Sequence, residues 1–186
     1  MLSHKYIILD RDGVINHDSS AYIKNPQEWR PIKRSLEAIS LLTKNSYRIL
    51  LLSNQAGVSR GIIKYEDLIL IHNKLISSCL EYGGKIFSTH YCYDHPDSNS
   101  TKRKPQPGMY LEIADRLGIN LSDVFAIGDS PTDMIAALSS GCKPIGVRTG
   151  NGSEIKDQMP EINLFDDLLD AAEYVIDYDK QYILNI

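Results

Sequence analysis

The sequence predicts an α/β fold in which helices cover both faces of a parallel sheet, giving three layers. Short apolar segments of strand length alternate with longer segments of helical periodicity, and this alternation occurs five times. Several short segments are apolar throughout, as expected for strands that are buried on both faces. The chain has 186 residues, about the length of one domain, so we expect residues 1–186 to form a single domain.

The predicted strands are defined by their length and apolar character. They cover residues 6–9, 49–52, 86–91, 124–127 and 144–147. The predicted helices lie between and after them, over residues 32–43, 65–82, 107–117, 131–139 and 165–176. Gly83 follows the second helix, and Pro107 and Pro131 suit the first turn of the third and fourth helices. The polar segment 149–160 is expected to be a loop.

The composition excludes several classes of function. Lys and Arg number 20 and Asp and Glu number 24, so the formal net charge is −4 and no basic excess is available to hold a nucleic acid. The longest apolar run, residues 134–138, is far shorter than the roughly 20 residues of a membrane span. Cys79, Cys92 and Cys142 are too few and too scattered for a disulfide framework. We therefore expect a cytoplasmic protein without a nucleic-acid or membrane partner.

Polar side chains follow four of the predicted strands. They are Asp10 and Asp12 after the first, Ser53 and Asn54 after the second, the run 102–104 after the third, and Asp129 and Asp133 after the fourth. The carboxyl ends of parallel strands meet at one edge, which is where open α/β sheets bind their ligands. Taken singly, each cluster is also typical of a turn or a helix cap.

The residue types at this edge favour phosphate chemistry. One aspartate of the pair Asp10 and Asp12 can attack an electrophile while the other transfers a proton. A small hydroxyl and an amide after the second strand suit a phosphate oxygen, and adjacent cations clamp anions. Carboxylates such as Asp129 and Asp133 are the ligands that Mg²⁺ prefers.

The ordered set D-x-D-G, S-N, K and G-D-x-x-x-D resembles the haloacid dehalogenase-like (HAD) phosphohydrolase superfamily over residues 6 to about 147. Segments 10–16, 53–61, 103–109, 128–129 and 147–150 are similar to the subfamily of D-glycero-D-manno-heptose-1,7-bisphosphate 7-phosphatases and histidinol-phosphate phosphatases. The resemblance implies a Rossmann-like fold and a Mg²⁺-dependent phosphatase that removes the 7-phosphate of this heptose bisphosphate. Histidinol phosphate or another small phosphomonoester is the alternative substrate.

The resemblance also implies a role for individual residues. Asp10 is the nucleophile that forms an aspartyl-phosphate, Asp12 is the general acid and base, and Lys104 neutralises charge on the phosphoryl group. Mg²⁺ lies on Asp10, the backbone carbonyl of Asp12 and Asp129, while Asp133 orients Lys104 or a metal-bound water. The expected substrate-binding residues are Asp18, Ser53, Asn54, Gln55, Arg60 and Arg103, the two arginines being partners for a second, non-reacting phosphate.

The resemblance also implies the kind of site, and the sequence departs from the subfamily at one point. The intervals from Asp10 to Ser53 and from Ser53 to Lys104 hold loops and single helices but no cap domain, so a capless, open site is implied. The subfamily usually holds a structural zinc in the third loop through a C-x-H and a later C-x-C pair. Here Cys92 is present, Asp94 replaces the histidine and the C-x-C is absent, so we expect no structural zinc.

Two other functions are compatible with the predicted fold. A non-catalytic binder of phosphorylated ligands is the main alternative from another class, but the presence of both Asp10 and Asp12 argues against it. A nucleic-acid 3′-phosphatase is disfavoured by the acidic charge. We expect a monomer that acts on a small phosphorylated sugar.

Overall fold

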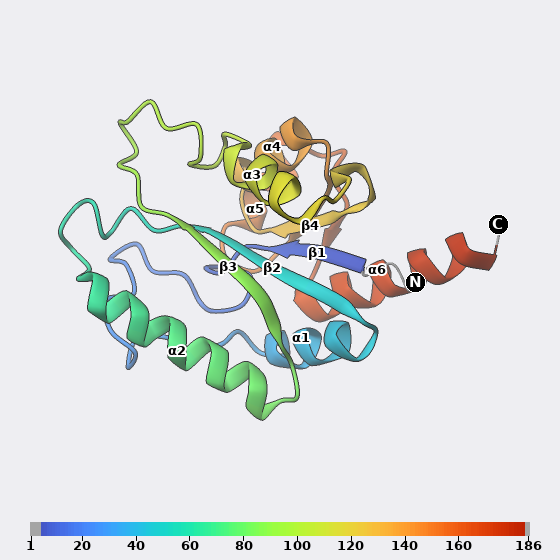
Figure 1. The fold of residues 1–186 in the computed structure, drawn as a ribbon, viewed down its shortest axis with the longest axis horizontal. Coiled ribbons are helices and arrows are strands. Elements are labelled where there is room, and N and C mark those ends of the chain that lie inside the picture. The colour runs from blue at the N-terminus through green and yellow to red at the C-terminus, as the bar shows by residue number, and fades with distance from the viewer. Residues whose placement is uncertain (1–4, 185–186) are drawn as a thin grey trace.

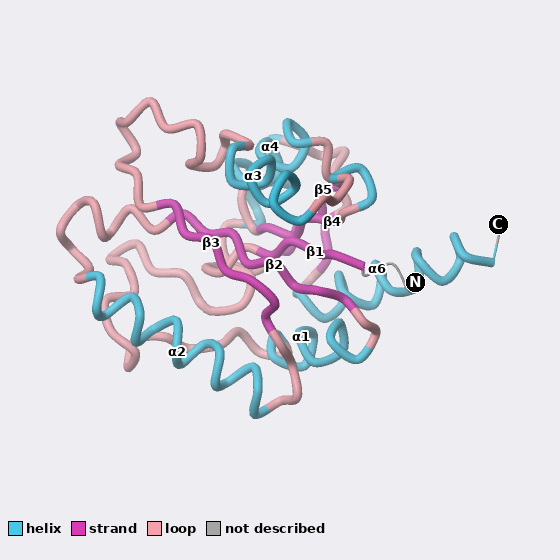
Figure 2. Tube along the Cα trace, in the orientation of Figure 1, coloured by secondary structure: helices cyan, strands magenta, loops and turns pink. Residues whose placement is uncertain are grey.

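The structure is a computed structural model that describes residues 5–184, with side chains through residue 181. Within these residues a six-stranded sheet has the order β3-β2-β1-β4-β5-β6 (Figures 1 and 2). Every neighbouring pair is parallel. The strands are β1 (Lys5–Leu9), β2 (Tyr47–Asn54), β3 (Ile86–Cys92), β4 (Phe125–Gly128), β5 (Lys143–Val147) and β6 (Leu164–Phe165). The predicted α/β fold is confirmed.

Helices cover both faces of this sheet. They are α1 (Ser35–Lys44), α2 (Tyr65–Glu81), α3 (Gly108–Leu117), α4 (Pro131–Ser140), α5 (Gly152–Gln158) and α6 (Leu168–Leu184), with a 3₁₀ turn at Leu121–Asp123. Helices α1, α2 and α6 pack on one face, and α3 and α4 on the other (Figure 1). The three predicted layers are therefore present.

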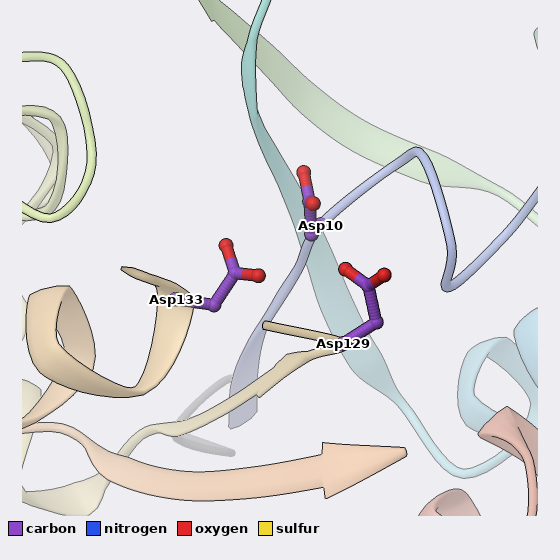
Figure 3. Close-up of side chains that lie close together, drawn as sticks. All are labelled: Asp10, Asp129 and Asp133. Atoms are coloured by element: carbon purple, nitrogen blue, oxygen red, sulfur yellow. The ribbon is translucent and has the colours of Figure 1, made fainter. Parts of the chain in front are cut away.

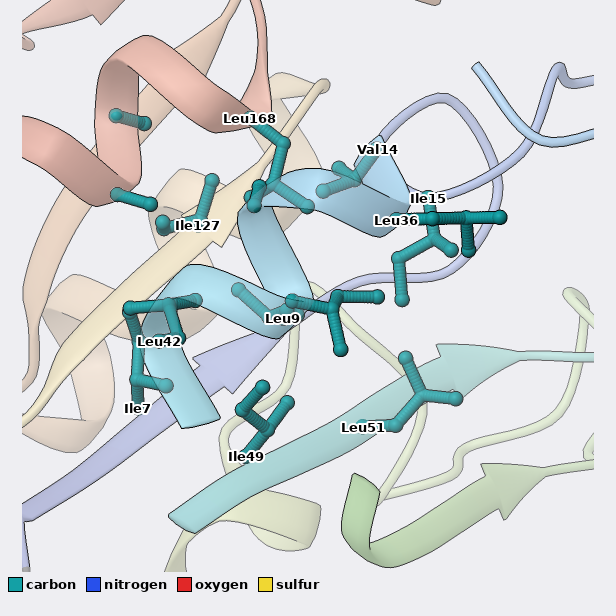
Figure 4. Close-up of a cluster of buried hydrophobic side chains, with 14 of the residues drawn as sticks. Ile7, Leu9, Val14, Ile15, Leu36, Leu42, Ile49, Leu51, Ile127 and Leu168 are labelled. Atoms are coloured by element: carbon teal, nitrogen blue, oxygen red, sulfur yellow. The ribbon is translucent and has the colours of Figure 1, made fainter. Parts of the chain in front are cut away.

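Alternation along the strands supplies both cores. Ile7 and Leu9 belong to the core under α1 and α6, shown in Figure 4, whereas Ile8 belongs to the core under α3 and α4. Successive strand side chains point to opposite faces. Because both faces are covered, every residue from Ile49 to Leu52 is fully buried, which explains the unbroken apolar runs in the sequence.

Two elements differ from the sequence prediction. The expected loop 149–160 contains α5, and the expected helix start at residue 165 lies in β6, which pairs with β5 through Gly146 and Val147. Helix α5 has seven residues and Ile155 is its one buried apolar side chain, so helical periodicity is not visible there. Strand β6 has only two residues and depends on its neighbour for its conformation.

The segments that follow the strands form no separate cap within residues 5–184. Loop 10–34 folds back onto the body through Val14, Ile15, Ile23 and Trp29, which are buried in the core beside α1. The loops at 55–64 and 93–107 lead directly into α2 and α3. The capless architecture is confirmed, and the carboxyl edge of the sheet is left open. None of the helices described among residues 5–184 combines the length and the hydropathy that a membrane span requires.

Candidate active site

One pocket at the carboxyl edge of the sheet collects most of the predicted site residues. Its volume is about 250 Å³. Nine of the predicted residues line it: Asp10, Asp12, Asp18, Ser53, Asn54, Gln55, Lys104, Asp129 and Asp133. A larger cavity of about 530 Å³ lies at the opposite, amino-terminal edge and contains none of them. The smaller pocket is therefore the candidate active site.

Lys104 bridges two carboxylates from different elements, since Asp10 follows β1 and Asp133 lies in the first turn of α4. Its Nζ lies 2.9 Å from Asp10 Oδ1 and 2.6 Å from Asp133 Oδ1, and it also donates to the carbonyl oxygen of Leu52 at 3.0 Å. Lys104 is only 4% exposed, so its ammonium is held by these protein groups rather than by water. Burial alone lowers the pKa of Lys104, but the charges of Asp10 and Asp133 outweigh it and raise that pKa well above the usual lysine value.

The backbone of Lys104 is positioned by Asn54. The Asn54 side chain donates to Lys104 O at 3.0 Å and accepts from Lys104 N–H at 3.1 Å. Asn54 is the last residue of β2, so this pair ties the third loop directly to the sheet. The sequence predicted that Asn54 binds phosphate. The structure adds a second role, because the Asn54 side chain holds the loop that carries Lys104.

Three carboxylates converge beside this lysine. Asp10, Asp129 and Asp133 each offer an oxygen within 4.8 Å of the others (Figure 3). Burial, with repulsion from the neighbouring aspartates, raises the pKa of Asp10 to about 7, although Lys104 opposes the shift. Burial and the charges of Asp10 and Asp133 raise the pKa of Asp129 to about 8. When all three carboxylates are ionised, the single positive charge of Lys104 cannot neutralise them. An excess of negative charge of this kind is typical of a cation-binding site.

Asp129 is held between two glycine-containing loops. Its Oδ2 accepts from Asn151 N–H at 2.8 Å. A Cβ on Gly13 or Gly150 would lie 2.0 Å or 2.1 Å from that oxygen, and both glycines have positive φ. The Thr149 hydroxyl donates to Gly13 O at 2.6 Å and joins the two loops. No larger residue fits at either glycine, because the carboxylate occupies the space that a Cβ needs.

Gly150→Ala should therefore disrupt the site. The new Cβ would meet Asp129 Oδ2 at 2.1 Å and Gly13 Cα at 2.7 Å, so the carboxylate must move. We expect a loss of at least about a hundredfold in kcat/KM, because small displacements of catalytic groups have effects of this order. Gly118→Ala is the matched control: Gly118 has the same φ of 60° but nothing within 4 Å of a Cβ. Equal activity of the two variants in a phosphate-release assay would contradict the prediction.

Asp12 accepts hydrogen bonds from three side chains. Arg11 donates from Nε at 3.1 Å and from Nη2 at 2.8 Å, and Asn16 and Gln55 each donate at 2.8 Å. Gln55 Nε2 also donates to Ser53 Oγ at 3.0 Å. The carboxylate of Asp12 is thus oriented by a network that includes the predicted phosphate-binding hydroxyl.

Arg11, Asn16 and Asn151 were missed by the sequence analysis. Arg11 is 1% exposed, and its Nη2 also donates to Gln55 Oε1 at 2.9 Å. The sequence did indicate a role for Arg11, because it is a charged residue between Asp10 and Asp12 at the end of a buried strand. Asn151 follows β5 at the same sheet edge, within the segment after Val147.

The two predicted arginines lie apart from the pocket. Arg60 is exposed in the loop after β2 and does not line it. Arg103 is half-buried and lines a neighbouring cavity of about 400 Å³ that shares Lys104 with the site. One nitrogen of its guanidinium group, Nη1, is buried without a hydrogen-bond partner. The substrate-binding roles of both arginines stay predictions.

Comparison with known proteins identifies the family. The chain is 41% identical over 175 residues to the D-glycero-beta-D-manno-heptose-1,7-bisphosphate 7-phosphatase of Bordetella bronchiseptica, covering 92% of this chain and 98% of that protein. It is 42% identical over 174 residues to the Pseudomonas putida protein of the same name, covering 92% and 99%. The chain belongs to this HAD-like phosphatase family. A HAD-hydrolase-like family model also matches residues 101–171.

Solved structures of the phosphatase family agree with the fold. A crystal structure of D,D-heptose 1,7-bisphosphate phosphatase from B. bronchiseptica, complexed with magnesium and phosphate, has a TM-score of 0.90 and 39% identity, covering 94% of this chain and 99% of that one. The corresponding enzyme from Burkholderia thailandensis has a TM-score of 0.71 and 31% identity, covering 94% and 97%. This chain is therefore an enzyme, a phosphatase of the HAD-like class.

The carboxylate cluster has the donor set of a magnesium site. All three side chains that converge are carboxylates, and hard oxygen ligands are those that Mg²⁺ selects. The cluster lacks the nitrogen and sulfur donors that favour zinc. Asp10 and Asp129 fit a divalent cation because burial and neighbouring carboxylates raise both pKa values, and a nearby cation favours the charged forms.

The stabilisation of the phosphatase by Mg²⁺ should increase with pH. The pKa values of Asp10 and Asp129 are raised from 3.8, the ordinary value, to about 7 and about 8 in the folded protein. The metal-free protein therefore loses stability as the pH rises from about 3.8 through these folded-state pKa values. Carboxylates bind Mg²⁺ in their deprotonated form, so a bound ion would have to displace protons at lower pH. We expect the increase in Tm on adding Mg²⁺ to be small at about pH 5.5 and several-fold larger at about pH 8.5. An equal or larger increase at the lower pH would contradict this assignment.

Proposed function

We propose that this phosphatase removes the 7-phosphate of D-glycero-D-manno-heptose 1,7-bisphosphate with Mg²⁺, through an aspartyl-phosphate intermediate. The observation that carries the proposal is the convergence of Asp10, Lys104 and Asp129 in one pocket, with Asp12 two residues from Asp10. The substrate follows the names of the relatives that match nearly the whole chain. We also propose that residues 1–186 act as a single domain and a monomer, since one chain supplies all these groups.

Asp10 is the proposed nucleophile. Lys104 binds Asp10 Oδ1 at 2.9 Å, which leaves Oδ2 as the oxygen that attacks phosphorus. The bond from phosphorus to the sugar oxygen breaks as the bond to Asp10 forms, and water then cleaves the acyl phosphate and regenerates the carboxylate. Asp133 holds the other side of the ammonium at 2.6 Å, so Lys104 stays in place during both steps.

Asp12 is the proposed general acid and base. In its protonated form it gives a proton to the leaving sugar oxygen, and as a carboxylate it then accepts one from the attacking water. Arg11, Asn16 and Gln55 orient its carboxylate. These hydrogen bonds keep the side chain in one orientation at the edge of the pocket.

The phosphoryl group is bound by the strand ends and by the cation. Ser53 Oγ accepts the hydrogen bond from Gln55, so its own proton is available to a phosphoryl oxygen. Asp10, Asp129 and the Asp12 carbonyl would hold Mg²⁺, which supplies the positive charge that lets a carboxylate approach a phosphate dianion. Asp18 and the loop arginines Arg60 and Arg103 are the proposed contacts to the rest of the sugar bisphosphate.

The test is phosphate release with Mg²⁺ from a substrate panel. The panel contains both anomers of the heptose 1,7-bisphosphate, histidinol phosphate, a simple sugar monophosphate and a 3′-phosphorylated oligonucleotide. We expect one phosphate to be released from the bisphosphate, leaving the 1-phosphate, with kcat/KM at least about tenfold above the other substrates. Faster turnover of histidinol phosphate would replace the proposed substrate. Salt-sensitive turnover of the oligonucleotide would favour a nucleic-acid phosphatase, and no turnover at all would favour a binder.

A further inference from the structure

The third loop, residues 93–107, carries Lys104 and must hold it beside Asp10. The relatives that the sequence resembles usually organise this loop with zinc. In this chain, Cys92 ends β3 and Asp94 lies at the start of the loop, but no C-x-C pair follows. The question is therefore what holds residues 102–104 in place.

A serine hydroxyl lies at the centre of the loop. Ser100 Oγ donates to Asp94 Oδ2 and accepts from the backbone N–H of Lys102 and of Arg103, each at 3.1 Å. The same oxygen lies 4.0 Å from Cys92 Sγ. One hydroxyl thus links the end of β3, through Asp94, to the backbone that immediately precedes Lys104.

Two further contacts make this segment rigid. Gly108 N–H donates to Thr101 O at 2.9 Å, and a Cβ on Gly108 would lie 2.2 Å from that oxygen. The backbone of Lys104 exchanges two hydrogen bonds with the Asn54 side chain. The four residues from Thr101 to Lys104 are thus held by α3 at one end and by β2 at the other, with Ser100 in contact with the two residues between them.

The donors in this loop do not fit zinc. A structural zinc takes four nitrogen or sulfur ligands. Within the described residues of the loop, Cys92 offers one sulfur, and the carboxylate of Asp94 already accepts from Ser100. His95 Nδ1 faces Asp97, from whose backbone N–H it accepts at 3.2 Å. The side chain near both Cys92 and Asp94 is that of Ser100, whose hydroxyl is not a usual zinc ligand.

We propose that Ser100 is a positioning residue that replaces a metal in the third loop. Its hydroxyl, with Asp94 as acceptor, holds the backbone of Lys102 and Arg103 so that the ammonium of Lys104 reaches both Asp10 and Asp133. The inference rests on the role proposed above for Lys104. It predicts that the loop is ordered without zinc and that the order of residues 102 and 103 depends on the Ser100 hydroxyl.

The test compares Ser100→Ala with Ser98→Ala. Ser98 lies in the same loop, and its hydroxyl donates to His95 O at 2.7 Å, so its loss removes a loop hydrogen bond that does not reach residues 102–104. We expect Ser100→Ala to lower kcat/KM about tenfold, and Ser100→Thr, which keeps a hydroxyl, to restore it to within about threefold of wild type. Ser98→Ala should stay close to wild type.

Hydrogen exchange and metal analysis give readouts apart from activity. The amides of Lys102 and Arg103 should exchange faster in Ser100→Ala than in Ser98→Ala, with no change in the strands. Purified wild-type protein should contain no stoichiometric zinc, and a zinc-selective chelator should leave its activity unchanged.

Several results would overturn the inference. Equal exchange in the two alanine variants, failure of Ser100→Thr to restore activity, or one equivalent of zinc in an enzyme that the chelator inactivates would each do so. If wild type does not hydrolyse the heptose bisphosphate, the proposed substrate fails. The role of Ser100 is then still decided by exchange and by turnover of p-nitrophenyl phosphate.

Discussion

Asp10→Asn is expected to abolish phosphate release, with a loss of at least about a thousandfold in kcat. The amide that replaces the carboxylate is nearly the same size but cannot attack phosphorus. Neither neighbour in the cluster is placed to replace it, since Asp129 is packed against Gly13 and Gly150 and Asp133 is paired with Lys104. Single-turnover assays with Mg²⁺ and the bisphosphate measure the effect directly.

The same substitution should not destabilise the fold. Burial and neighbouring aspartates raise the pKa of Asp10 to about 7, so at higher pH its charged form is unfavourable in the folded protein. A neutral amide removes that repulsion, and we expect the Tm of the metal-free variant at about pH 8 to equal or exceed that of wild type. Asp115→Asn, an exposed position on α3, is the control and should change neither activity nor Tm. Substantial turnover by Asp10→Asn would remove Asp10 from the mechanism.

Lys104→Met should cost both activity and stability. Methionine fills similar space but leaves Asp10 and Asp133 without their shared cation, at a site where Lys104 is 4% exposed. Removal of one partner from a buried ion pair typically destabilises by about 3–5 kcal/mol. We also expect kcat to fall at least about a hundredfold, because the negative charge of the transferring phosphoryl group loses its neutralising partner.

A second variant separates the two effects. In Lys104→Met the carboxylate of Asp133 has lost its cation. Adding Asp133→Asn removes that unpaired charge, so urea denaturation should show that part of the lost stability is recovered. Activity should remain low, because the ammonium is still absent. If Lys104→Met unfolds at the same urea concentration as wild type, the buried bridge does not stabilise the protein as described. Recovery of activity in the double variant would exclude a catalytic role for the ammonium.

Strand positions and the approximate site were predictable because they depend on local patterns. Residues 49–52 are apolar since β2 is buried on both faces, and that burial is visible as an unbroken run. Helix α5 and strand β6 were not predictable in this way. Helix α5 buries a single apolar side chain, Ile155, and β6 is held by its pairing with β5 rather than by its own residues.

Which side chains meet at the sheet edge followed from the order of the motifs, since parallel strands bring Asp10, Ser53 and Asp129 to one edge whatever the loops do. How these groups are held could not be read from the chain. Arg11 and Gln55 are hydrogen-bonded but 44 residues apart in the sequence. The corresponding separations are 52 residues for Lys104 and Leu52 and 136 residues for Thr149 and Gly13. Such contacts have no local signature, because they form only when the packed sheet brings loops from distant parts of the chain within hydrogen-bond distance. Local pattern thus predicts the residues of the site, and packing sets their orientation and charge.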